Sequence, residues 1–176
     1  MPRLPELHRR DALADDARQV YDDIIQARGK VANSYAVMLH APALVARIVQ
    51  LATNLRFESS LSRLTLELVA LTVSAELDNP YEIGVHTPSA LQAGVDPATL
   101  AAIKTKASLE GGGNDTRIPV ECARELLRTH GLSDGSFRAA HGMLGDRGVV
   151  EFVGAVGFYS MLSLMQNALQ VRLPDS

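Results

Sequence analysis

The sequence predicts an all-α fold, and three observations support this prediction. Apolar residues recur at helical spacing, as at Leu13, Ala17, Val20 and Ile24, a pattern typical of amphipathic helices. The chain has no tryptophan and only 5% aromatic residues, which disfavours sheet-rich folds because strands use aromatic residues heavily. No convincing run of alternating apolar and polar residues, the period of a half-buried strand, is present.

Glycines, prolines and short polar residues set the helix boundaries. Gly29 is expected to end the first helix as a C-cap, and Pro42 fits the first turn of the third. Asp96 and Pro97 begin a later helix, and the run SLEGGGND at 108–115 is expected to be a loop. The sequence therefore predicts helices over about 11–28, 33–40, 42–57, 61–77, 80–93, 97–106, 117–130, 133–144 and 147–170.

Capping residues support three of these boundaries. Ser59 or Ser60 is expected to cap the apolar helix over 61–77, and Ser133 the helix over 133–144. Asn79 is a possible N-cap for the helix that follows, with Glu82 three residues later. This spacing resembles a capping box in which Asn replaces Ser or Thr.

Composition limits the classes of protein to which the chain can belong. Its 176 residues, 47% apolar and 21% charged, fit one soluble domain or a pair of small intertwined halves. We expect a single domain, in which residues of about 1–58 form an N-terminal helical extension before the segment that carries the candidate site. The net charge of −3 without a strong basic run makes nucleic acid an unexpected partner. The single cysteine, Cys122, excludes an internal disulfide and a multi-cysteine metal site. No signal peptide is evident, so a cytoplasmic location is expected.

Two helices are apolar on more than one face, over 61–77 and 149–170. Apolar surface that a small chain has trouble covering is typical of subunit interfaces, so we expect a homo-oligomer. Residues 149–165 approach the length of a membrane span, but Glu151 within them favours a buried or interface helix, and no membrane partner is expected. Tyr159, a polar group in this helix, could reach a pocket or satisfy a buried carbonyl.

The candidate site begins with a lone carboxylate, Glu67, in an otherwise apolar helix. An isolated buried carboxylate is strongly unfavourable, so it needs a partner or a shifted pKa. Glu82 and His86, four residues apart, share a face of the next helix. The Asp-Asn-Pro break at 78–80 favours an antiparallel hairpin that brings Glu67 alongside them. Two acids and a histidine meeting between helices could transfer protons.

The same residues allow other interpretations. A structural network would have Glu82 capping its helix and Glu67 paired with Arg63, one turn earlier. Two glutamates and a histidine could also ligate a divalent ion, but a single Glu-x-x-x-His motif is present, so neither a metal nor another cofactor is expected. Arg56 could bind a substrate carboxylate in bidentate fashion or form a surface ion pair.

Residues 55–103 resemble the carboxymuconolactone decarboxylase family, which includes the AhpD-like alkylhydroperoxidases. Family members show an Arg-x-x-x-Glu-Leu helix, then a Tyr-Glu-x-x-x-His helix, then an Ala-Gly-hydrophobic turn. The corresponding residues here are Arg63 to Glu67-Leu68, Tyr81-Glu82 to His86, and Ala93-Gly94-Val95. The C-terminal run GVVEFVGAVGFYSMLSLMQNALQV is also similar to the last helix of the family. The resemblance implies an AhpD-like helical bundle in an intertwined homo-oligomer, often a trimer or hexamer.

The peroxidase branch of the family uses a CxxC pair with a nearby Glu and His. The two cysteine positions fall on Asn79 and Glu82 here, and thiol peroxidase chemistry requires a thiolate and a resolving thiol. We therefore do not expect peroxidase activity.

The decarboxylase branch lacks the CxxC pair and implies a cofactor-free lyase of aromatic compound catabolism. Its substrate would be a small carboxylated lactone or related metabolite. The implied catalytic residues are Glu67, Glu82 and His86, with His86 as the proton donor, and the implied substrate-binding residues are Arg56 and Tyr81. A metal-dependent or hydrolytic proton-transfer enzyme, and a non-catalytic helical oligomer, are the alternatives.

Overall fold

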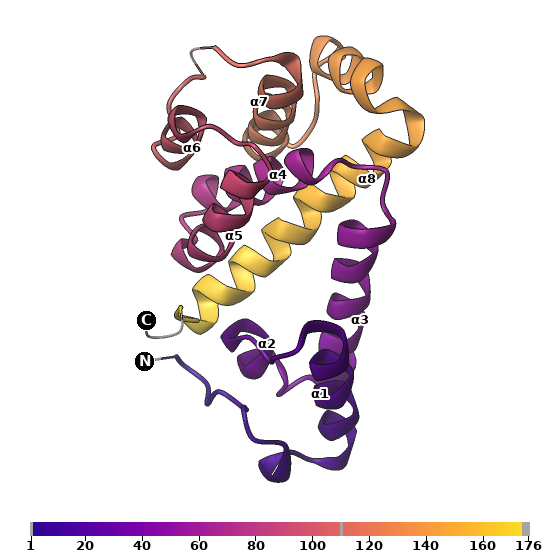
Figure 1. Cartoon of the computed structure of the whole chain (residues 1–176), viewed down its shortest axis with the longest axis vertical. Helices are drawn as coiled ribbons and strands as arrows, with labels where there is room; N and C mark the ends of the chain where they lie inside the picture. Colours follow the sequence, from indigo (N-terminus) through magenta and orange to yellow (C-terminus); the bar gives the residue numbers. More distant parts are fainter. Residues whose placement is uncertain (1, 110, 174–176) are drawn as a thin grey trace. The chain divides into compact units, whose positions relative to one another are not determined.

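The computed structural model describes residues 2–109 and 111–173, and the regular elements in these residues are all helical (Figure 1). The all-α prediction is therefore confirmed. The chain divides into two compact units, Met1–Asn54 with Met165–Ser176 and Leu55–Leu164. All of the predicted site residues belong to the second unit. The expectation that the whole chain is one domain stays a prediction.

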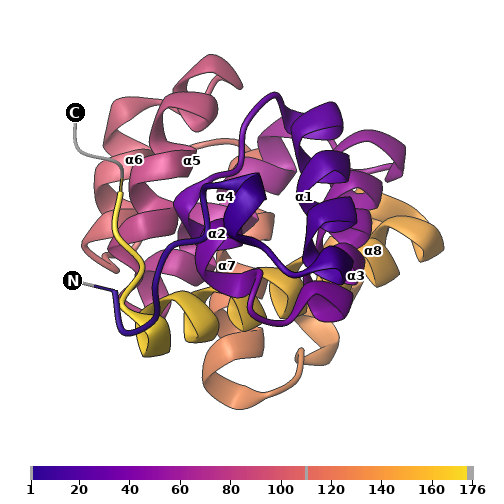
Figure 2. The ribbon, with the colours of Figure 1, turned by 90° about the horizontal axis from the view of Figure 1, so that it is seen from below.

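The first unit contains α1 (Asp15–Arg28), α2 (Asn33–Met38) and α3 (Pro42–Thr53). Helices α1 and α3 pack side by side (Figure 2). Gly29 ends α1 in the left-handed region at φ 74°, as expected for a C-cap glycine. Helix α1 begins later than the predicted residue 11 because Arg10–Ala12 form a separate 3₁₀ turn.

The second unit is built around α4 (Arg63–Glu76), which contacts α5 (Pro80–Gln92), α6 (Pro97–Lys104) and α7 (Asn114–Thr129) (Figure 1). Every residue of α4 from Thr65 to Ala75 is buried, so neighbours cover this helix on all its faces. This explains why its sequence is apolar all round. The core cluster of this unit includes Leu68, Leu71, Ala90, Ile103 and Val120.

The predicted cap of α4 is wrong by two or three residues. Its N-cap is Ser62, whose Oγ accepts a hydrogen bond from the Thr65 amide at 3.0 Å. Ser60 instead donates to Glu151, through its amide at 2.7 Å and its hydroxyl at 2.6 Å. The preceding residues, Asn54–Glu58, form a short π-helix rather than the end of α3.

Helix α8 (Asp134–Leu169) is kinked at Gly145, which has φ 68° and ψ −179°. Glycine tolerates this conformation because it has no Cβ. The kink separates the two helices predicted over 133–144 and 147–170, and Ser133 caps the first through the Ser136 amide at 3.3 Å. Of the predicted loop at 108–115, residues 114–115 begin α7, and Glu110 lies outside the described residues.

By length and composition alone, α8 could cross a membrane, and it is the one such helix in the described part of the chain. Its most apolar window is 44% buried within the protein. The core helices of soluble proteins have the same length and composition, so this finding does not by itself indicate a membrane protein.

Candidate functional site

The three residues expected to converge meet between α4 and α5. His86 Nδ1 lies 2.6 Å from Glu67 Oε2, and His86 Nε2 lies 3.0 Å from Glu82 Oε2. All three residues are buried, with exposed fractions of 3% for Glu67, 5% for Glu82 and 8% for His86. The site is therefore an imidazole held between two carboxylates and nearly closed to solvent.

The start of α5 places Glu82 on the imidazole. The Asn79 side chain caps this helix, accepting from the amides of Tyr81 at 3.0 Å and Glu82 at 3.2 Å. The predicted capping box is incomplete, however, because the Asn79 amide donates to the Ser74 carbonyl at 2.8 Å. Glu82 is thus not needed as a capping group. Its carboxylate instead pairs with the ring of His86, one helical turn later.

Arg63 extends this cluster toward solvent. Its Nε donates to Glu67 Oε1 at 2.6 Å, and its side chain is 44% exposed. The Arg63–Glu67 pair that the structural interpretation predicted is therefore present, and it belongs to the same network as His86. The result is a continuous chain of charged groups, Arg63–Glu67–His86–Glu82, with one end in solvent and the other end buried.

The charges in this chain stabilise one another. Burial disfavours the imidazolium of His86, but hydrogen bonds to Glu67 and Glu82 outweigh it and raise the pKa of His86 to about 9. Burial likewise opposes ionisation of Glu67, yet the hydrogen bonds from His86 and Arg63 hold the pKa of its carboxyl below the usual value. At neutral pH both ring nitrogens of His86 donate, and the residue is a buried cation.

Tyr159 brings α8 to the site. Its ring meets the His86 ring edge to face, with 5.3 Å between centroids and an interplanar angle of 89°. Tyr159 is partly exposed whereas His86 is buried, so one side of the imidazole packs against a ring that itself reaches solvent. Its polar character within an apolar helix was the signal available in the sequence, but nothing local indicated which residue it contacts.

The two predicted substrate-binding residues lie in different surroundings. Arg56 is exposed in the π-helix, with its guanidinium carbon 5.8 Å from the centre of the Phe57 ring. The described ion-pair partners of His86 are Glu67 and Glu82, not Arg56. Tyr81 is 4% exposed in the first turn of α5, next to Glu82. Substrate binding by either residue stays a prediction.

The donor set at His86 suits proton transfer better than metal binding. In the described ranges, no group of three or more His, Cys, Asp or Glu side chains is arranged to hold a metal ion. Both ring nitrogens of His86 point at carboxylates, and a protonated imidazole has no lone pair for a metal. The arrangement can hold a proton at Nε2 and release it to an acceptor.

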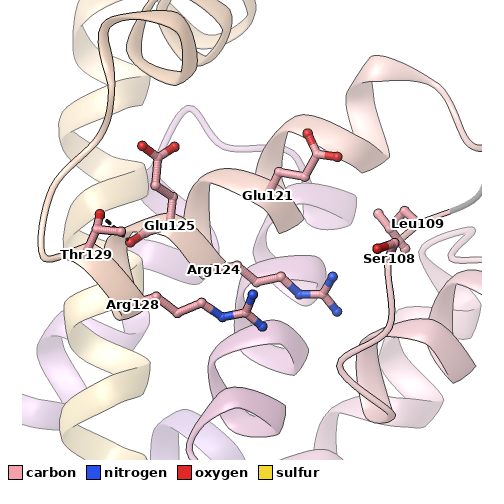
Figure 3. A pocket seen from close by; sticks show the side chains of 7 residues that line it. All are labelled: Ser108, Leu109, Glu121, Arg124, Glu125, Arg128 and Thr129. Carbon is pink, nitrogen blue, oxygen red and sulfur yellow. Dashed lines mark hydrogen bonds between the residues drawn. The ribbon is translucent and has the colours of Figure 1, made fainter.

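A separate cavity of about 300 Å³ lies along α7 and does not include the cluster at His86 (Figure 3). Two arginines line it, and both are bound within the protein. Arg128 forms two hydrogen bonds with Glu76, at 2.9 and 2.6 Å, and Arg124 donates to the Ala107 carbonyl at 2.7 Å. These arginines therefore join α7 to the ends of α4 and α6, which is a structural role.

Cys122 cannot supply a reactive thiolate to this site. It lies on α7, is 2% exposed, and its Sγ donates to the Ser136 carbonyl at 3.6 Å. Burial, with the nearby charges of Glu125 and Glu121, raises the pKa of the thiol to about 11. Since a thiolate is the reactive form, this cysteine is inert at neutral pH.

Comparisons with known proteins agree with this fold. Residues 42–117, which include every predicted site residue, match the model of the carboxymuconolactone decarboxylase family. The chain is similar to the crystal structure of an alkylhydroperoxidase AhpD core, an uncharacterized peroxidase-related protein from Ralstonia eutropha JMP134. The TM-score is 0.81 at 18% identity, covering 99% of this chain and 93% of that one.

A second solved structure, an uncharacterized peroxidase-related protein from Silicibacter sp. TM1040, has a TM-score of 0.77 at 18% identity. The alignment covers 98% of this chain and 92% of that chain. Identities this low establish the fold alone. No curated protein matches the chain.

Proposed function

We propose that this protein is a cofactor-free lyase that removes CO2 from a small carboxylated lactone, a proposal supported by the match of residues 42–117 to the model of the carboxymuconolactone decarboxylase family. The observation that carries this proposal is the position of His86 between Glu67 and Glu82, with Nδ1 and Nε2 each within hydrogen-bond distance of a carboxylate oxygen, an arrangement that favours the imidazolium. A positioned imidazolium is an effective general acid. Decarboxylation of a conjugated lactone needs such an acid, because a carbon atom must be protonated as CO2 leaves.

The proposed reaction is balanced without a cofactor. The bond between the lactone ring and the departing carboxylate breaks, and its electron pair moves into the conjugated system toward the lactone carbonyl. CO2 leaves, and the proton on His86 Nε2 is transferred to the ring system at carbon. His86 is then neutral until it recovers a proton from water.

The two carboxylates have different tasks in this proposal. Glu67 is the closer partner of His86, at 2.6 Å, and Arg63 fixes its position, so it orients the ring through Nδ1. Glu82 is the more distant partner, at 3.0 Å. We assign Nε2 as the nitrogen that releases the proton, with Glu82 moving aside when the substrate binds. The partly exposed side chains of Arg63 and Tyr159 mark the approach to the buried imidazole.

The test is proton incorporation from solvent. Purified protein is incubated in D2O with a panel of carboxylated butenolides, including carboxymuconolactone, and NMR follows CO2 release and deuterium at carbon. We expect His86→Gln to lower kcat at least about 100-fold, the usual contribution of a general acid. The matched control is His141→Gln, because His141 also pairs with a carboxylate, Asp146 at 2.6 Å, but at the surface. Its kcat should equal that of the wild type.

Two results would contradict the proposal. If His86→Gln keeps the kcat of the wild type, His86 is not the general acid of the reaction. A wild-type protein that releases CO2 from no member of the panel would contradict the lyase proposal and leave the structural network, the non-catalytic oligomer and the metal-dependent or hydrolytic enzyme as the alternatives.

We also propose that the protein acts as a homo-oligomer. One face of the second part of α8 is apolar and exposed, with Val150 at 74%, Val153 at 42% and Leu164 at 60%. The exposed glycines Gly154 and Gly157 lie on the same face and allow close approach of a second helix. Exposed apolar surface of this kind is typical of subunit interfaces.

Sedimentation measures this self-association directly. We expect Val150→Asp combined with Leu164→Asp to convert the oligomer to monomer, because each substitution would bury an unpaired charge in the interface. The exposed Arg138, earlier in the same helix, gives the control substitution Arg138→Asp, which should leave the oligomer intact. A monomeric wild-type protein would contradict the proposal.

A further inference from the structure

We propose that the cavity along α7 binds a phosphate group, carried by free phosphate or by a small phosphomonoester. This site is separate from the cluster at His86, so the inference does not rest on the proposed lyase activity. The cavity has a volume of about 300 Å³, which is at the low end of the ~300–1,000 Å³ typical of small-molecule sites. The arrangement of charges in its lining favours an anion.

Two guanidiniums line this cavity from one face of α7. Arg124 and Arg128 are four residues apart on the helix, so their side chains are neighbours. Figure 3 shows both guanidiniums extending toward Ser108, whereas the carboxylates of Glu121 and Glu125 extend to another side of the helix. One wall of the cavity is therefore cationic.

A single carboxylate pairs with both arginines. Arg128 donates to Glu76 from Nε at 2.9 Å and from Nη2 at 2.6 Å, and Arg124 Nε lies 3.4 Å from Glu76 Oε1. Burial is the main cause that lowers the pKa of Arg124, the charge of Arg128 lowers it further, and the opposing effects of Glu76 and Glu121 do not restore it. Like charges four residues apart destabilise a helix, so a bound anion would balance the charge that Glu76 leaves over.

The other carboxylates of the lining are bonded elsewhere. Glu125 accepts from the Ser133 amide at 2.6 Å, and Glu121 accepts from Arg117 at 3.0 Å. Glu121 is the group that opposes an anion, because its negative charge acts on Arg124. Its ion pair with Arg117 offsets that charge in part, and removing the charge provides a test.

The two arginines retain N–H groups for a ligand. The hydrogen bonds described for Arg128 use Nε and Nη2, which leaves Nη1, and the side chain is 53% exposed. Arg124 donates from Nη1 to the Ala107 carbonyl and from Nη2 to the Ala102 carbonyl, and each of these nitrogens carries a second hydrogen. The hydroxyl of the exposed Ser108 is a further donor. Several donors around one anion suit the oxygens of a phosphate group.

The lining also has an apolar part. Leu109 is partly buried and packs against the core cluster of this unit, and it lines the same cavity. A free phosphate would use the cationic wall alone, whereas a phosphomonoester could place its organic group against Leu109. The affinities of the two ligands therefore identify which of them the site prefers.

Calorimetric titration of the full chain tests the proposal. The probes are inorganic phosphate and glycerol 3-phosphate, at neutral pH and constant ionic strength. We expect saturable binding of one ligand per chain. Tighter binding of the ester identifies a phosphomonoester as the ligand, and equal or tighter binding of phosphate identifies the free ion. Arg128→Gln should weaken binding about tenfold, the effect of losing a charged hydrogen-bond donor.

A second variant guards against a folding defect, because it should bind more tightly. Glu121→Gln removes the negative charge nearest the arginines, and we expect it to raise the affinity about threefold, as for one partly screened charge. The matched control is Arg10→Gln. Arg10 holds Asp22 with two hydrogen bonds at 2.7 and 2.8 Å and is 56% exposed, but it does not line the cavity. It should bind phosphate as the wild type does.

Four results would overturn the inference. They are no saturable binding of either probe, equal affinity in Arg128→Gln and the wild type, weaker binding in Glu121→Gln, and a loss in Arg10→Gln as large as that in Arg128→Gln. The last result would mean that phosphate responds to the overall charge of the protein rather than to this cavity. None of these outcomes depends on CO2 release, so the lyase proposal is tested separately.

Discussion

Glu67→Gln is expected to lower the free energy of unfolding at pH 7 by about 3 kcal/mol, the low end of the range for breaking a buried ion pair. Glu67 is 3% exposed and accepts from both Arg63 and His86 at 2.6 Å, so the substitution removes one anion from two ion pairs. The loss stays at the low end because His86 keeps its second carboxylate, Glu82 at 3.0 Å, and Arg63 is 44% exposed to water.

Urea denaturation of the wild type and two variants measures this effect. Glu121→Gln is the control, since Glu121 also pairs with an arginine one turn earlier, Arg117, but both side chains are about half exposed, at 50% and 45%. Its free energy of unfolding should change by less than about 0.5 kcal/mol, as for other exposed pairs. Similar losses in the two variants would show that burial does not strengthen the Glu67 interactions.

The second large effect is a loss of stability with rising pH. Although burial opposes it, the hydrogen bonds to Glu67 and Glu82 raise the pKa of His86 in the folded protein from its ordinary value of 6.5 to about 9. A raised pKa means that the folded state binds the proton more tightly, so the stabilisation is complete below about pH 6.5 and is lost as the pH rises to about 9. The shift corresponds to about 3 kcal/mol, at about 1.4 kcal/mol per pKa unit.

Free energies of unfolding measured across pH 6–9, below the range in which Cys122 contributes, check this prediction. The wild type should lose stability across the interval, whereas His86→Gln, which has no proton to release there, should show a nearly flat profile. A wild-type profile that is flat, or that rises with pH, would mean that His86 is neutral in the folded protein. That outcome would also contradict the proposed reaction, which requires His86 to be protonated at neutral pH.

These two stability effects and the catalytic test address different properties. A structural network of Arg63, Glu67, His86 and Glu82 produces both stability effects whether or not it has a substrate. Loss of CO2 release in His86→Gln is specific to the lyase. The combination therefore separates a buried network that only holds α4 to α5 from one that also transfers protons.

The sequence alone determined the helical class, most helix boundaries and the residues of the cluster. Short-range interactions fix these features: Gly29 and Asn79 act within a turn of their own helices, and Glu82 and His86 share a face by spacing. The Asp-Asn-Pro break folds α5 back along α4, which is why the approach of Glu67 to His86 was predictable.

Only the tertiary structure decided how these groups are bonded. The Asn79 amide donates to the Ser74 carbonyl, which releases Glu82 from the predicted capping box to bind His86. Tyr159 reaches the imidazole from α8, far along the chain, and Arg63 rather than Arg56 joins the cluster. Such choices depend on which helices pack together and which polar atoms they bury, and residue spacing along one helix does not contain that information.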